Sequence, residues 1–123
     1  MIDRNKINLQ YVKYSACIKK ALTFIRENLS ASLTLAKISE GIFVSKSTLT
    51  KHFQKELSTS VNEYVTRLIM SEAESLLSTT ELSVGAISEE LGFSDQLYFS
   101  RRFKEIHGVC PSEYRKKSSY LIG

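Results

Sequence analysis

An internal repeat is the feature that most restricts what this chain can fold into. The segment Ile38-Ser39-Glu40 recurs forty-nine residues later as Ile87-Ser88-Glu89. The pairs that match at this offset, or at an offset of fifty after one inserted residue, are Leu35/Val84, Ile42/Leu91, Val44/Phe93, Ser45/Ser94, Leu49/Phe99, Lys51/Arg101, Phe53/Phe103 and Tyr64/Tyr114. Helical spacing and serine caps can recur by chance in any all-α protein, but chance accounts poorly for matched aromatic and basic positions. The repeat therefore predicts two copies of one supersecondary unit.

Each copy has the pattern of a short helix, a tight turn and a second helix. In the first copy, Thr34 and Ser45 stand where a helix N-cap is expected, because their hydroxyls can accept a hydrogen bond from a free amide of the first turn. In the second copy, Ser83 and Ser94 take the capping places. The apolar residues that follow the first two caps recur at helical spacing: Leu35, Ile38 and Ile42, then Leu49, Phe53 and Leu57. This is the helix-turn-helix pattern.

The rest of the chain completes an all-α fold of about seven helices. A first helix is predicted over 15–29, and a long helix begins at Ser60, which can form a capping box with Glu63. The long helix has few breakers, so we expect it to join the two helix-turn-helix units, and Pro111 starts a last short helix. The predicted segments are a linker or N-terminal tail at 1–14, the first unit at 15–59, the linker helix at 60–79, the second unit at 80–118 and a C-terminal tail at 119–123.

The charge and the cysteines set broad limits on the function. The formal net charge is +4, from 17 Lys and Arg against 13 Asp and Glu, which permits a nucleic-acid partner without requiring one. Cys17 and Cys110 lie far apart and are expected to be small buried apolar residues of a reduced protein. No apolar run approaches the roughly 18 residues of a membrane span, and the N-terminus lacks the apolar segment of a secretory signal. We therefore expect a cytoplasmic protein with no membrane partner.

No catalytic or metal-binding arrangement is predicted. His52 and His107 stand without a neighbouring cysteine or carboxylate at metal-ligand spacing, and no glycine-rich phosphate loop occurs. We expect His52 to meet phosphate or solvent from the exposed side of its helix, and His107 to interact with carbonyls at a helix end. The chain is therefore predicted to be no enzyme and to need no cofactor.

The second helices of the two units, predicted at about 45–57 and 94–107, have two faces of opposite character. In the later one, Phe99, Phe103 and Ile106 share a side that is expected to anchor in a core. The opposite side carries groups of the kind that read base edges in the major groove, where Arg or Lys pairs with guanine, Gln with adenine and an apolar tip with the thymine methyl. The predicted base-contacting residues are Gln96, Leu97 and Arg101 in the second unit and Ser47, Thr50 and Lys51 in the first. Because the hydroxyls of the first unit are short and less selective, we expect stricter reading by the second.

Phosphate contacts are predicted at the margins of the same faces. Cationic side chains, and hydroxyl or amide groups at a helix start, can hold phosphates without reading sequence. The predicted phosphate-contacting residues are Ser45, Lys46, Lys55, Ser94, Arg102 and Lys104. A solvated helix surface is the plainer interpretation of one charged stripe, but two stripes at matched positions of a repeat favour double-stranded DNA as the partner.

The segment from Gly92 to Arg115, GFSDQLYFSRRFKEIHGVCPSEYR, resembles the C-terminal motif of the AraC/XylS family of bacterial transcription regulators. The resemblance implies a DNA-binding domain of seven helices whose two recognition helices enter successive major grooves. It also implies a transcription activator or repressor that contacts RNA polymerase. The sequence departs from the family pattern at Phe43 and Ser58, where glycines are usual, at Ser39 and Ser88, where alanine is usual, and at Ile69, where arginine is frequent.

Most members of this family carry a separate N-terminal domain that binds an effector or forms dimers. A chain of 123 residues has no room for one, so a small-molecule effector is expected only if a separate N-terminal domain exists. The weakly patterned stretch at 7–14 would suit a linker, which favours a fragment of a longer regulator over a stand-alone one. The alternative function, motivated by the unusual first unit, is a helical protein-interaction co-regulator that keeps the fold but binds polymerase or another regulator instead of DNA.

Overall fold

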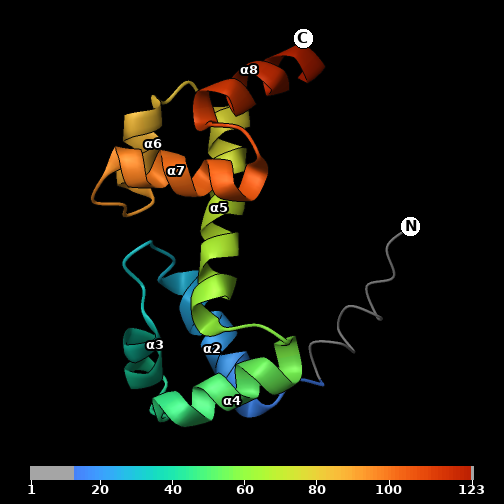
Figure 1. Cartoon of the computed structure of the whole chain (residues 1–123). Coiled ribbons are helices and arrows are strands. Elements are labelled where there is room, and N and C mark those ends of the chain that lie inside the picture. Colours follow the sequence, from blue (N-terminus) through green and yellow to red (C-terminus); the bar gives the residue numbers. More distant parts are fainter. Residues whose placement is uncertain (1–12, 123) are drawn as a thin grey trace. The chain divides into compact units, whose positions relative to one another are not determined.

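The computed structural model describes residues 13–122, and this part of the chain forms seven α-helices and no strands (Figure 1). The helices are α2 (Ala16–Glu27), α3 (Leu35–Gly41), α4 (Lys46–Leu57), α5 (Val61–Thr79), α6 (Val84–Glu90), α7 (Gln96–His107) and α8 (Pro111–Ile122). The predicted all-α fold of seven helices is confirmed. The predicted N-terminal linker lies almost wholly outside the described residues.

The described residues form two compact units. The first unit holds the residues up to Asn28 together with Leu33–Tyr64, and the second holds Leu29–Ser32 and the residues from Val65 onward. The boundary falls within α5, the helix that the sequence predicts as a separate connecting segment. Each unit contains a short helix, a tight turn and a 12-residue helix, which are α3 and α4 in the first unit and α6 and α7 in the second.

The helices of the first unit begin where the sequence predicts. The hydroxyl oxygens of Ser15, Thr34 and Ser45 each accept a hydrogen bond from the backbone N–H three residues on, at 3.1 to 3.2 Å. Each cap satisfies one free N–H and stabilises its helix by about 1 kcal/mol. The helices then pack on fully buried apolar side chains, which include Ile18, Ile25, Ile38, Leu49 and Phe53.

In the second unit, the N-cap of α7 is Asp95, so the predicted cap at Ser94 is wrong. The Asp95 carboxylate accepts a hydrogen bond from the N–H of Leu97 at 2.8 Å. The backbone explains the shift, because the N–H of Phe93 still bonds to the carbonyl of Ser88 at 3.0 Å and the repeat keeps its register up to that point. Ser94 is therefore the inserted residue of the repeat. The Asp95 carboxylate at the N-terminus of α7 also stabilises the positive end of the helix dipole.

The buried face of α7 differs from the predicted one at its C-terminal end. Phe99 and Phe103 are fully buried as expected, but Ile106 is 41% exposed. The ring of His107 lies against Phe103 instead, with centroids 4.2 Å apart. The prediction that Ile106 anchors the helix is wrong. His107, four residues after Phe103, takes that place on the buried side of the helix.

α8 is fastened to the end of α5 by Arg115. Its guanidinium donates hydrogen bonds to the carbonyls of Leu77 and Thr80, at 3.1 and 3.3 Å. These carbonyls lie at the C-terminus of α5 and just beyond it, where carbonyls lack helical partners and cations are favourable. α8 then continues to Ile122, so helical structure extends into the segment predicted as a tail.

The two tight turns have the same backbone but different residues. Gly92 lies between α6 and α7 with a φ of 88°, and Phe43 lies between α3 and α4 with a φ of 60°. Glycine adopts this left-handed conformation without strain, whereas an aromatic residue does not. Phe43 is also 93% exposed, so packing offsets little of the strain.

We expect Phe43→Gly to raise the free energy of unfolding of the first unit by about 1 kcal/mol. Relief of backbone strain, typically about 1–3 kcal/mol, outweighs the greater entropy of glycine in the unfolded chain, which costs about 0.4–1 kcal/mol. Urea unfolding would measure the difference. Phe43→Ala is the control, because it removes the ring but keeps a Cβ atom. Equal stabilisation by both changes would mean that backbone strain is not the cause.

Candidate nucleic-acid interface

α7 presents an exposed face opposite its buried aromatic residues. Leu97 is 73% exposed, and Arg101 and Lys104 also face solvent. These three side chains follow one another at spacings of four and three, which places them on one side of the helix. Phe99 and Phe103 hold the other side in the core. The helix therefore combines a rigid attachment with an accessible cationic surface.

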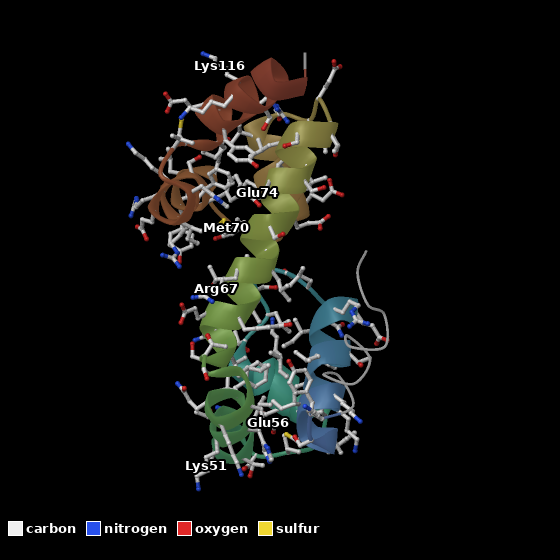
Figure 2. The ribbon with its side chains drawn as sticks, turned by 90° about the vertical axis from the view of Figure 1, so that its right-hand side faces the viewer. Lys51, Glu56, Arg67, Met70, Glu74 and Lys116 are labelled. Carbon is white, nitrogen blue, oxygen red and sulfur yellow. The ribbon has the colours of Figure 1, made fainter. Side chains whose placement is uncertain are left out.

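α4 repeats this arrangement in the first unit. Ser47, Thr50 and Lys51 are exposed, while Leu49 and Phe53 are fully buried. Figure 2 shows Lys51 projecting away from the body of the unit. At these three positions α4 carries two hydroxyls and a lysine, where α7 has Leu97, Ser100 and Arg101. The predicted chemical difference between the two helices is thus present on accessible surfaces.

A polar cluster ties α4 to the start of α2. The Glu56 carboxylate accepts hydrogen bonds from the backbone N–H and the hydroxyl of Ser15, each at 2.7 Å, and lies 2.7 Å from Nδ1 of His52. Burial opposes ionisation of Glu56, but the hydrogen bonds from Ser15 and the contact with His52 outweigh it and lower the pKa of the carboxyl below its ordinary value. Figure 2 places Glu56 on the side of α4 that faces α2. This cluster fixes the rotation of α4 about its own axis.

His52 has a partner on its own helix in addition to the predicted exposure to solvent. Its ring contacts Glu56 and Ser15, neither of which was predicted from the sequence, and its side chain keeps 35% exposure to solvent. Helical spacing brings Glu56 close to it, because residues four apart are neighbours on a helix.

His107 also has a partner that the sequence did not reveal. Its Nδ1 atom lies 3.1 Å from a carboxylate oxygen of Glu74 on α5, a residue labelled in Figure 2. The predicted interaction with helix-end carbonyls is wrong, because the ring lies between α7 and α5 and contacts Phe103 and Tyr114. His107 thus fastens the C-terminal end of α7 to α5.

Residues 13–122 contain no group of three or more side chains that could hold a metal ion. Across the same residues, no helix combines the length and the apolar character needed to cross a membrane.

The family model for a helix-turn-helix domain matches residues 38–117, which is most of the chain. The chain belongs to the AraC/XylS family. Two relatives illustrate the similarity. The Msm operon regulatory protein of Streptococcus mutans is 34% identical over 102 residues, which cover 83% of this chain and 37% of that protein. The arabinose operon regulatory protein of Escherichia coli is 35% identical over 99 residues, which cover 80% of this chain and 34% of that protein.

A solved structure agrees with the sequence comparison. The C-terminal domain of AraT, a response regulator from Geobacillus stearothermophilus, is 33% identical and superposes with a TM-score of 0.82 over 85% of this chain and 88% of that domain. The chain spans little more than a third of the length of the curated relatives above. It therefore corresponds to the AraC-type domain of those proteins.

The AraC-type domain places most of the predicted phosphate contacts on accessible surface. Ser45, Lys46, Lys55, Ser94 and Lys104 are exposed. Arg102 is half-buried and pairs with Glu105, at 2.5 Å between nitrogen and oxygen. The structure also shows that Lys46 and Gln96 occupy the same position, the first residue of α4 and of α7, although the sequence predicts a phosphate contact for one and a base contact for the other.

Sequence reasoning missed three residues that position α4 and α7 in this AraC-type domain. Asp95 caps α7, Glu56 ties α4 to α2, and Glu74 holds His107. Capping preference could not separate Asp95 from Ser94, because aspartate ranks with serine as an N-cap. Glu56 was detectable from its spacing to His52. Glu74 carries no signal in the sequence, because its partner lies on another helix.

Proposed function

We propose that this AraC-type domain binds double-stranded DNA sequence-specifically and regulates transcription in bacteria. α4 and α7 each enter a major groove with the exposed face described above. The observation that carries the proposal is the pair of matched 12-residue helices, each held by two buried aromatic or apolar residues and each presenting a cation at the same position, Lys51 and Arg101. The names of the relatives, which are operon regulators, support the same function.

Within this function, each predicted residue takes a role from its chemistry. Arg101 suits guanine, because its planar fork matches two acceptors on that base. Leu97 suits a thymine methyl, Gln96 suits adenine, and Ser47, Thr50 and Lys51 make the contacts of the first unit. Ser45, Lys46, Lys55, Ser94, Arg102 and Lys104 hold phosphates and fix the position of the domain on the duplex.

Further parts of the proposal concern the whole regulator. The regulator would act in the cytoplasm and would contact RNA polymerase. Its function would be binding and not catalysis. A small-molecule effector would act through an additional domain, since the chain spans little more than a third of its curated relatives.

We expect Arg101→Ala to weaken binding to a selected DNA site about tenfold to a hundredfold, which corresponds to the roughly 1–3 kcal/mol of one good base contact. Binding to random DNA should fall much less. Fluorescence anisotropy with both kinds of DNA measures the two effects, and the site itself comes from in vitro selection with the unmodified chain. Lys51→Ala is the matched variant in the first unit, and its effect on the selected site should be smaller.

Two further results bear on this proposal. The logarithm of the affinity should fall with the logarithm of salt concentration, with a slope of about −0.9 per phosphate neutralised. Equal losses on selected and random DNA after Arg101→Ala would contradict a base contact. If the unmodified chain bound no DNA and captured a protein partner, the alternative function, a protein-interaction co-regulator, would be favoured instead.

A further inference from the structure

The side-chain amide of Gln96 lies over Gly85 of the neighbouring helix α6. A Cβ atom built on Gly85 would come within 2.8 Å of Oε1 and 3.6 Å of Cδ of Gln96. A separation of 2.8 Å is shorter than a carbon and an oxygen that are not bonded can tolerate. Oε1 can therefore occupy this position only because residue 85 has no side chain, whereas Cδ lies at an ordinary contact distance.

The backbone gives no other reason for glycine at this position. Gly85 is the second residue of α6 and is not among the residues with positive φ, which include Gly92 and Gly108. The matched position in the first unit is Ala36, the second residue of α3. A Cβ atom is thus compatible with this place in the fold, and the feature that differs is the neighbouring side chain at the start of the recognition helix.

The position of the amide bears on what Gln96 can read. Gln96 is the first residue of α7, and its side chain must extend outward to reach a base edge. An amide that lies back against α6 has to change rotamer before it can bind adenine. When only a fraction of molecules is competent to bind, the apparent affinity falls by that fraction.

We propose that Gly85 sets how strictly the domain reads the base pair under Gln96, by allowing the amide to lie back on α6. Gly85 is a specificity-determining residue that acts through Gln96 and does not itself touch DNA. The inference rests on the proposed DNA-binding function. An alanine at residue 85 excludes the present position of Oε1, so the amide shifts away from α6 and Gln96 reads its base more strictly.

In vitro selection of DNA sites with four proteins tests the proposal: the unmodified chain, Gly85→Ala, Gln96→Ala and the double variant. The base position that loses its preference in Gln96→Ala should be the position where Gly85→Ala strengthens preference, by about twofold to tenfold. Gly85→Ala should have no effect at that position in the Gln96→Ala background, because coupled residues are not additive. Unchanged preference in Gly85→Ala would overturn the proposal, and so would a change that persists in the double variant.

A measurement without DNA separates this inference from the function on which it rests. The NMR signals of the Gln96 side-chain amide should shift in Gly85→Ala and in Gly85→Ser, which also carries a Cβ atom, and an unchanged signal would overturn the inference. Both variants should melt no lower than the unmodified chain, because alanine and serine favour helices over glycine. If the unmodified chain selects no DNA sequence, the proposed function fails. If it selects one that Gly85→Ala reads identically, only the inference fails.

Discussion

Phe103→Ala is expected to lower the free energy of unfolding of the second unit by about 3–5 kcal/mol. Phe103 is fully buried, and its ring centroid lies 6.0 Å from Phe99, 5.5 Å from Tyr114 and 4.2 Å from His107. Truncation removes the transfer free energy of the ring and leaves a cavity among the three others. Small domains are stable by about 5–15 kcal/mol in total, so much of the stability of this unit would be lost.

Hydrogen exchange followed by mass spectrometry would show where the stability is lost. Peptides from α6 and α7 should exchange faster in Phe103→Ala, whereas peptides from α3 and α4 should change little. Phe53→Ala, at the matched position of the first unit, should give the reverse pattern. Phe103→Leu is the conservative control and should have a smaller effect, because it leaves a smaller cavity. Equally faster hydrogen exchange in both units would contradict the expectation that each unit is stabilised by its own core.

The parts of this fold that follow from local rules were predictable from the sequence. Serine and threonine caps with helical spacing of apolar residues give the helices of the first unit, because one hydroxyl satisfies one free amide and one face must be buried. The repeat predicts that α4 and α7 are equivalent helices of the two units. The choice between Ser94 and Asp95 as the cap of α7 was not predictable by capping preference, since both residues cap well. The hydrogen bond from Phe93 to Ser88 decides it.

The parts of the candidate site that depend on contacts between helices were not predictable. The pairing of His107 with Glu74 joins residues 33 positions apart, and no periodicity links them. The position of Gln96 over Gly85 likewise depends on how α6 and α7 pack. The base contacts of Arg101 stay a prediction, because exposure shows that a side chain is accessible and not what it binds.

Gly92→Ala is expected to lower the free energy of unfolding of the second unit by about 2–4 kcal/mol. Gly92 has a φ of 88°, and a Cβ atom there would lie 2.1 Å from Oγ of Ser30 and 3.3 Å from the backbone nitrogen of Ala31. Left-handed strain costs about 1–3 kcal/mol, and displacement of the neighbours adds to it. The neighbours resist displacement because Ala31 donates a hydrogen bond to the carbonyl of Leu91 at 2.8 Å, and Ser30 Oγ accepts one from the N–H of Ser32 at 3.1 Å.

A double variant separates the two causes. Ser30→Gly removes the hydroxyl that a Cβ atom on residue 92 would meet, so Gly92→Ala should cost less in that background while the left-handed strain remains. Urea unfolding of the four proteins gives the coupling free energy directly. Full additivity would mean that Ser30 does not oppose the Cβ atom. Phe43 shows that contact of the side chain with its neighbours matters in addition to φ. The first unit tolerates a side chain at the matched turn because the Phe43 side chain is almost wholly exposed. Gly92 lies against Ser30 and Ala31 and has no room for a side chain.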